Sequence, residues 1–121
     1  MKKLLIVDDD PHLLESLCVV FNGLYEVITA VSAEEADTLL GRQEMDVMLL
    51  DIVLPGIDGV EFLRNIREKK SYLPVVMISG VSSIRPVMKA LELGASDFIR
   101  KPFDIDELRL VVARALQVSE L

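Results

Sequence analysis

Five short, largely apolar runs, each followed by apolar residues at helical spacing, constrain this chain more than any other feature. Runs of four or five residues are too short for helices and indicate strands, most of them buried on both faces. Strands that alternate with amphipathic helices predict an α/β fold, with a parallel sheet between two layers of helices. The expected strands are 4–7, 25–29, 46–50, 74–78 and 97–100, of which the second is the most mixed in composition.

The segments between these runs carry the start and stop signals of helices. Four of the five begin with a residue that favours an N-cap, and an apolar stripe at helical spacing follows in each. Pro86 is compatible with a helix over 84–93 only in its first turn, where amide donors are unpaired. The expected N-caps are Asp10, Ser32, Asp58 and Asp104, and the expected stops are Asn22-Gly23, Gly41 and Gly94.

Length and composition fit one folded domain and exclude several classes of protein. The chain has 121 residues, 51% of them hydrophobic, and a net charge of -7, which argues against direct binding to nucleic-acid phosphates. Cys18 is the single cysteine, so no internal disulfide can form, and its place on an apolar stripe predicts burial. No apolar stretch approaches membrane-spanning length, and the run at 4–7 meets three aspartates too early for a signal peptide. We therefore expect a cytoplasmic protein.

Polar side chains stand at the ends of four of the five expected strands. In an open parallel sheet, the functional crevice lies beyond the carboxyl ends of the strands. With the strand order 2-1-3-4-5, the third strand is central, and the second, which ends without such a group, fits an edge. The strand-end residues are Asp8 and Asp9 after the first strand, Asp51 after the third, Ser79 after the fourth and Lys101 after the fifth.

These strand-end residues together suit phosphoryl transfer. Three neighbouring carboxylates repel one another unless a cation lies among them, and oxygen ligands without a His or Cys cluster favour Mg²⁺. A carboxylate nucleophile gives an acyl phosphate, while a lysine and a hydroxyl can contact the phosphoryl oxygens. The sequence therefore predicts that Asp51 accepts a phosphoryl group beside a metal ion.

The chain also resembles the receiver domain of two-component response regulators. The matching segments occur in order over nearly the whole chain: LIVDD at 5–9, LDIVLPGIDG at 50–59, ISG at 78–80, GASDF at 94–98 and KPF at 101–103. The resemblance implies a doubly wound, flavodoxin-like (βα)5 fold of the CheY-like type, with strand order 2-1-3-4-5. Residues 1–117 would form the receiver domain, and 118–121 would be a tail or the start of a linker.

The resemblance also implies a role for each residue of the site. Asp51 would be the phosphoacceptor, and Mg²⁺ would be held close to it. Ser79 and Phe98 would be a switch pair that responds to the phosphoryl group. The implied metal ligands are Asp9, Asp51 and the backbone carbonyl of Val53, and Asp8 would act through a metal-bound water. Lys101 would contact the phosphate. The Lys101-Pro102 peptide bond would be cis.

By the same resemblance, the partners would be a sensor histidine kinase or phosphotransfer protein and a downstream output domain or effector. Phosphorylation would change the face formed by the fourth helix, fifth strand and fifth helix. The domain would turn over no external metabolite and would bind neither nucleic acid nor membrane directly. A phosphorylation-dependent homodimer is an alternative. Glu107 is followed four residues later by Val111 and not by Arg, unlike receivers joined to winged-helix domains that dimerise through this face.

Two other functions remain alternatives to the switch. A pseudo-receiver that binds partners without phosphate would typically lack an acid or the lysine, and none is missing here. A Mg²⁺-dependent phosphatase with an aspartate nucleophile would show Asp-x-Asp after its first strand, whereas Asp51 is followed by Ile52 and Val53.

Apolar Val53 and Val81, two residues after Asp51 and Ser79, offer no group to orient an attacking water, so we expect a long-lived acyl phosphate. His12 is read as a solvated residue near the site. Asp58 is read as a turn and cap residue without a chemical role.

Overall fold

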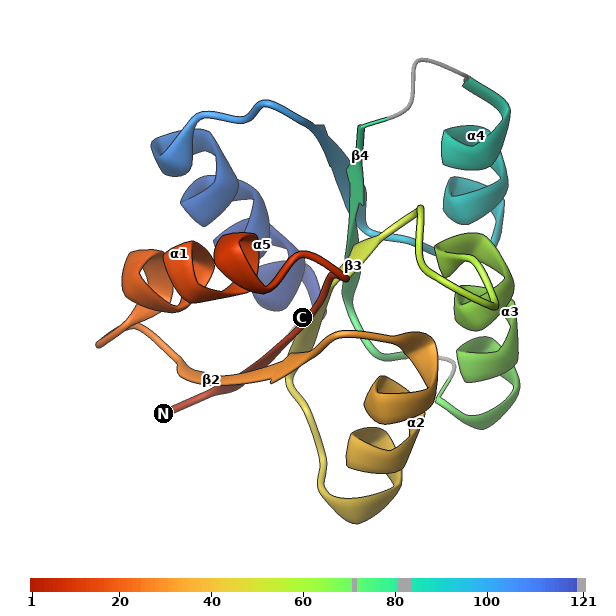
Figure 1. The fold of residues 1–121 in the computed structure, drawn as a ribbon, viewed down its shortest axis with the longest axis horizontal. Coiled ribbons are helices and arrows are strands. Elements are labelled where there is room, and N and C mark those ends of the chain that lie inside the picture. The colour runs from red at the N-terminus through yellow and green to blue at the C-terminus, as the bar shows by residue number, and fades with distance from the viewer. Residues whose placement is uncertain (71, 81–83, 120–121) are drawn as a thin grey trace.

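The computed structural model describes residues 1–70, 72–80 and 84–119, and it has one parallel sheet of five strands (Figure 1). The spatial order is β2-β1-β3-β4-β5, which confirms the predicted doubly wound topology with the third strand at the centre. Each strand begins within one residue of its predicted position. The strands are β1 (Lys3–Val7), β2 (Glu26–Ala30), β3 (Val47–Asp51), β4 (Val75–Ser79) and β5 (Asp97–Arg100).

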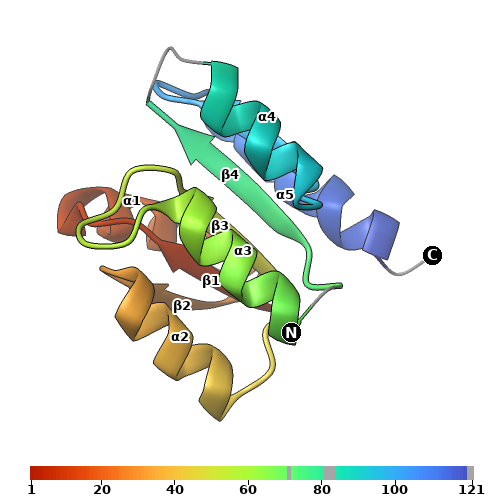
Figure 2. The same ribbon diagram turned by 90° about the vertical axis from the view of Figure 1, so that its right-hand side faces the viewer.

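Helices cover both faces of the sheet, as Figure 1 shows edge-on and Figure 2 shows from one side. The helices α1 (Pro11–Phe21) and α5 (Ile105–Ser119) pack on one face. The helices α2 (Ala33–Arg42), α3 (Gly59–Lys69) and α4 (Ile84–Glu92) pack on the other. Each layer buries its own apolar cluster against the sheet, and β1, β3 and β4 supply side chains to both clusters. Burial on both faces explains why these strands read as continuous apolar runs.

The predicted helix caps are present. The side chain of Asp10 accepts from the backbone N–H of His12 at 3.0 Å, Ser32 from Glu35 at 3.1 Å, and Asp58 from Glu61 at 2.9 Å. One predicted stop was wrong: Gly41 lies inside α2, which continues to Arg42 and ends at Gln43. A glycine costs an exposed helix only about 1 kcal/mol, so a packed helix can continue through it.

Two further details differ from expectation. The second strand is shifted by one residue to Glu26–Ala30, and Tyr25 instead packs edge-to-face on Phe21 with 5.7 Å between ring centroids. Cys18 is half-buried, because it lies on the flank of α1 beside the stripe that faces the sheet. Within the described part of the chain, every helix is too short or too polar to cross a membrane.

Candidate functional site

The carboxyl ends of the central strands bring the predicted residues to one edge of the sheet. Val7 is paired with Leu50 and Asp51 with Ile78, so the residues that follow β1 lie beside the end of β3. Ser79 is paired with Arg100, the residue before Lys101. Parallel register therefore assembles side chains that lie far apart in the sequence.

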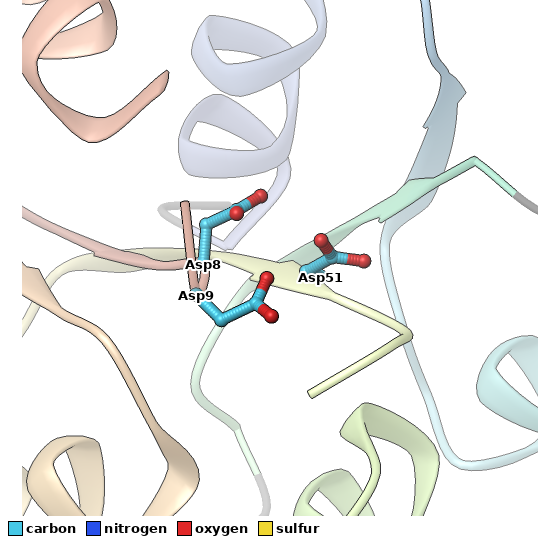
Figure 3. A group of neighbouring side chains, drawn as sticks. All are labelled: Asp8, Asp9 and Asp51. Carbon is cyan, nitrogen blue, oxygen red and sulfur yellow. The ribbon is translucent and has the colours of Figure 1, made fainter. Parts of the chain in front are cut away.

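Three carboxylates converge at this edge (Figure 3). Asp8, Asp9 and Asp51 each offer an oxygen, and these atoms lie within 4.8 Å of one another. Asp8 is fully buried, Asp51 is 4% exposed and Asp9 is exposed. Asp8 and Asp51 are thus shielded from solvent, whereas the side chain of Asp9 is accessible to it.

Lys101 is the cation of this site. Its Nζ donates to Oδ2 of Asp51 at 2.9 Å and to Oδ2 of Asp8 at 3.0 Å, so one ammonium group bridges the two buried carboxylates. The backbone N–H of Lys101 donates to the carbonyl of Ser79 at 2.8 Å, which fixes the start of the side chain at the end of β4. The Lys101-Pro102 peptide bond is cis.

Backbone amides orient both buried carboxylates. The N–H of Val53 donates to Oδ1 of Asp51, and the N–H of Asp10 donates to Oδ1 of Asp8, each at 2.9 Å. Both bonds reach back two residues, so the loop after each strand holds the acid that ends it. Among the described residues, each oxygen of Asp51 accepts from one donor, which leaves a lone pair for a metal ion or for attack on phosphorus.

The site perturbs the proton affinities of its two central groups. Burial raises the pKa of Asp51, and the nearby Asp8 adds to this, against the opposing effect of Lys101 and the Val53 amide. Burial by itself would lower the pKa of Lys101, but hydrogen bonds and charge from Asp51 and Asp8 outweigh it and raise that pKa. The two carboxylates therefore favour the charged form of Lys101, whereas burial disfavours the charged form of Asp51.

The donor set fits a hard divalent cation. Asp8, Asp9 and Asp51 together carry three formal negative charges against the single charge of Lys101, and all of their donor atoms are oxygen. Mg²⁺ prefers carboxylate ligands and keeps several waters, which suits a site with one exposed acid. Asp8, Asp9 and Asp51 can each offer an oxygen to such an ion, and Asp8 and Asp51 each also accept from Lys101 and from one backbone amide.

Ser79 and Phe98 lie on the same face of the sheet but in different environments. Phe98 is paired with Met77, two residues before Ser79, so both side chains project toward the layer that contains α4. Ser79 is 1% exposed, whereas Phe98 is 41% exposed. Phe98 therefore lies partly in contact with solvent on the edge strand β5, whereas Ser79 is enclosed at the end of β4.

Gly59 is a residue whose importance the sequence reasoning missed. Its N–H donates to the carbonyl of Ile52 at 2.7 Å, and a Cβ would overlap the carbonyl oxygen of Asp51 and lie 2.8 Å from Cα of Ile52. Only glycine lets the first turn of α3 approach the end of β3 so closely. A glycine directly after the Asp58 cap was the available signal.

The remaining predictions concern residues near this edge. His12 is exposed on α1 and its N–H binds the Asp10 cap, in agreement with its reading as a solvated residue. Val53 is exposed, and Val81 lies outside the described residues.

Comparison with known proteins identifies relatives over nearly the whole chain. Residues 4–113 match the family described as the response regulator receiver domain. The chain is 40% identical over 98% of its length to the C4-dicarboxylate transport transcriptional regulatory protein DctD of Pseudomonas aeruginosa, and 34% identical over 100% to the regulatory protein AtoC of Escherichia coli. It spans 26% of each of these two proteins.

A solved structure has the same fold. The CheY-like response regulator receiver domain protein of Methanospirillum hungatei superimposes with a TM-score of 0.93 at 30% identity, and the match covers 99% of this chain and 97% of that one. The architecture is therefore shared with a receiver domain over 97% of that chain.

Proposed function

This chain belongs to the response regulator receiver domain family of two-component systems, and on that premise we propose that it is a switch operated by phosphorylation of Asp51. A histidine kinase or phosphotransfer protein supplies the phosphoryl group. The domain catalyses its own phosphoryl uptake and hydrolysis and acts on no external metabolite.

One observation carries this proposal: a buried carboxylate nucleophile lies between a lysine and two further acids. Asp51 is 4% exposed, its Oδ2 accepts from Lys101, and Asp8 and Asp9 lie beside it. Nothing in the fold needs this accumulation of charge, since apolar residues would stabilise a strand end better. The arrangement is suited to attack on phosphorus, with Lys101 placed to move from carboxylate oxygens to phosphoryl oxygens.

The proposed metal ligands are Asp9, Asp51 and the carbonyl of Val53, with Asp8 acting through water. A bound Mg²⁺ would neutralise charge on the phosphoryl oxygens. The chain's own groups do the rest: the Val53 amide orients the Asp51 carboxylate, and the Asp10 amide and Lys101 hold Asp8.

Ser79 and Phe98 are the proposed switch pair. A phosphoryl group on Asp51 adds charge and acceptor oxygens, to which the Ser79 hydroxyl can donate. Movement of Ser79 toward that group would free space on the face that it shares with Phe98, and the exposed ring could then turn inward. Phosphorylation shifts this equilibrium only by contacts that differ between the two states, and the hydroxyl supplies one of them.

The proposed output surface is the face of α4, β5 and α5. Apolar side chains at the spacing of one helix face are exposed on α4, and Phe98 is exposed on β5; the residues are Ile84, Met88, Leu91 and Phe98. A change in Phe98 would alter this surface directly. Relatives such as DctD are named as transcriptional regulators and are about four times longer, which supports an output domain that acts on transcription. Homodimerisation through this face is a second proposed readout.

The test is phosphoryl uptake in the presence of Mg²⁺ and acetyl phosphate, read by intact-protein mass. We expect one added phosphoryl group, its loss in Asp51→Asn, and its retention in Asp46→Asn, which alters the acid at the opposite end of β3. No uptake from any donor would leave a phosphate-independent binding module. Rapid turnover of phosphate esters would indicate a phosphatase.

The lifetime of the acyl phosphate is a separate part of the proposal. Val53 is exposed beside Asp51 and carries no group that could orient water. We expect slow hydrolysis, and Val53→Asn should accelerate loss of the phosphoryl mass.

A further inference from the structure

A groove adjoins the acidic site between the β3–α3 loop and the amino-terminal half of α4. Its volume is about 470 Å³, and its walls are mainly apolar. Ile52 and Val53, which directly follow Asp51, form the wall nearest the site, and Val60 and Pro86 continue it. The groove therefore begins where the phosphoacceptor strand ends.

Two cations stand on the α4 wall of this groove. Arg85 and Lys89 are one helical turn apart, and both line it. Among the described residues, Arg85 forms no hydrogen bond or ion pair, and Lys89 approaches only Glu92, at 4.0 Å. The acid that lines the groove, Asp58, already caps α3. In a chain of net charge -7, this groove offers an anion an apolar surface and two cations.

Phosphoryl transfer from a small acyl phosphate produces such an anion. An oxygen of Asp51 attacks phosphorus and forms a new P–O bond, while the bond from phosphorus to the acyl oxygen breaks. The electron pair stays on that oxygen, which departs as a carboxylate, and no proton or further reactant is needed. In-line attack places the leaving group on the side of phosphorus away from Asp51.

We propose that this groove binds the acyl portion of an acyl phosphate and that Arg85 stabilises the carboxylate as it departs. The inference rests on the proposed function of Asp51 and adds to it a site for the leaving group of the phosphodonor. Lys101 is not assigned this role, because its Nζ is already bound to Asp51 and Asp8 and it does not line the groove. Arg85 and Lys89 are the cations that line the groove, and Arg85 lies nearer the start of α4.

Two phosphodonors separate leaving-group stabilisation from general attraction of anions. Acetyl phosphate releases a carboxylate, whereas phosphoramidate releases neutral ammonia, yet both are anionic phosphodonors. With Mg²⁺ present, we expect Arg85→Gln to slow labelling by acetyl phosphate about threefold to tenfold. This effect is smaller than that of removing a buried oxyanion donor, because the guanidinium of Arg85 is exposed and its charge is screened. Labelling by phosphoramidate should change less than about twofold.

The matched control is Arg64→Gln, which removes a partly exposed arginine of α3 that lies outside the groove. Its rates with both donors should equal those of the wild type. An equal loss of rate with both donors in Arg85→Gln would overturn the proposal. It would mean that Arg85 acts on the phosphoryl group or on the stability of the fold, and not on the leaving group. An unchanged rate with both donors would overturn it as well.

The apolar wall has its own test. Benzoyl phosphate should label the wild type faster than acetyl phosphate does, and Val60→Thr, which keeps the shape of the side chain, should reduce that preference about threefold. Equal reduction for both donors would count against acyl binding in the groove. Failure of the proposed function is distinguishable from these outcomes, since the wild type would then take up no phosphoryl group from any donor.

Discussion

The strand β3 has an aspartate at each end, and the two occupy different environments. Asp46, just before the strand, is half-buried, and its Oδ2 accepts from the backbone N–H of Lys3 at 2.7 Å. Asp51, the last residue of the strand, is buried beside Asp8 and Asp9 and shares Lys101 with Asp8. Asp46 joins two strands, whereas Asp51 lies in a group with excess negative charge.

The same contrast extends along both edges of the sheet. At the amino edge, polar groups join neighbouring elements: Arg67 of α3 donates to the carbonyls of Leu93 at 2.7 Å and Gly94 at 3.0 Å, just after α4. Lys70 pairs with the exposed Glu44 at 3.3 Å. At the carboxyl edge, charge is concentrated and buried. The comparison shows that the position of an aspartate in the fold, and not its residue type, decides whether it joins neighbouring elements or belongs to the functional site.

The largest expected effect is the loss of the cation at the carboxyl edge. Lys101→Met leaves Asp8 and Asp51 buried without a counter-charge, and should lower the free energy of unfolding by about 3 kcal/mol in metal-free buffer. Added Mg²⁺ should recover part of this loss by binding the folded state. Urea unfolding with EDTA and with MgCl₂ measures both. Lys70→Met at the amino edge is the control and should change the free energy of unfolding by less than about 0.5 kcal/mol. Equal effects of the two variants would contradict the difference between the two edges of the sheet.

A matched pair of glycines tests the packing beneath the site. Gly59→Ala places a Cβ against the Asp51 carbonyl and should cost about 2–3 kcal/mol of unfolding free energy. Gly41→Ala meets no atom within 4 Å and should instead stabilise the protein by up to about 1 kcal/mol. Thermal unfolding of both variants checks the sign as well as the size, and a stabilising Gly59→Ala would contradict the close approach of α3 to β3.

Arg67 tests whether the amino edge is structural only. Arg67→Met removes three hydrogen bonds to carbonyls and should cost about 2 kcal/mol of unfolding free energy. Phosphoryl uptake at Asp51 should persist, since the change lies at the far edge of the sheet. Arg64→Met, which loses an exposed pair with Glu61, should cost less than about 0.5 kcal/mol. Loss of phosphoryl uptake in folded Arg67→Met would contradict the separation of the two edges.

The smallest effect concerns the charge of Asp51 itself. Because burial raises its folded-state pKa above the unfolded value, Asp51 favours folding below the unfolded pKa, and this contribution is lost as pH rises through the folded pKa. Metal-free Asp51→Asn should therefore be more stable than the wild type at neutral pH by about 1 kcal/mol, since Lys101 stays paired with Asp8. The gain should vanish in acid. Unfolding as a function of pH measures this gain in stability. A similar gain in Asp46→Asn would show that the two ends of β3 do not differ in this respect.

The alternation of strands and helices could be predicted from local pattern alone. Buried runs such as 4–7 and 74–78 are continuous because both faces are covered, and caps such as Ser32 act on amides two or three residues away. Element boundaries that depend on tertiary packing could not be predicted in this way. Gly41 does not end α2, and Tyr25 packs on Phe21 and does not enter β2, because tertiary contacts outweigh local preference there.

The sequence by itself determined which residues stand at the carboxyl edge, because strand ends and parallel topology follow from the order of the segments. Only the tertiary structure decided how those residues meet. It places one ammonium group between Asp8 and Asp51, leaves Phe98 exposed on the face of Ser79, and brings Gly59 against β3. These are contacts between residues up to 93 positions apart, and they depend on side-chain reach and on space, which residue spacing does not encode.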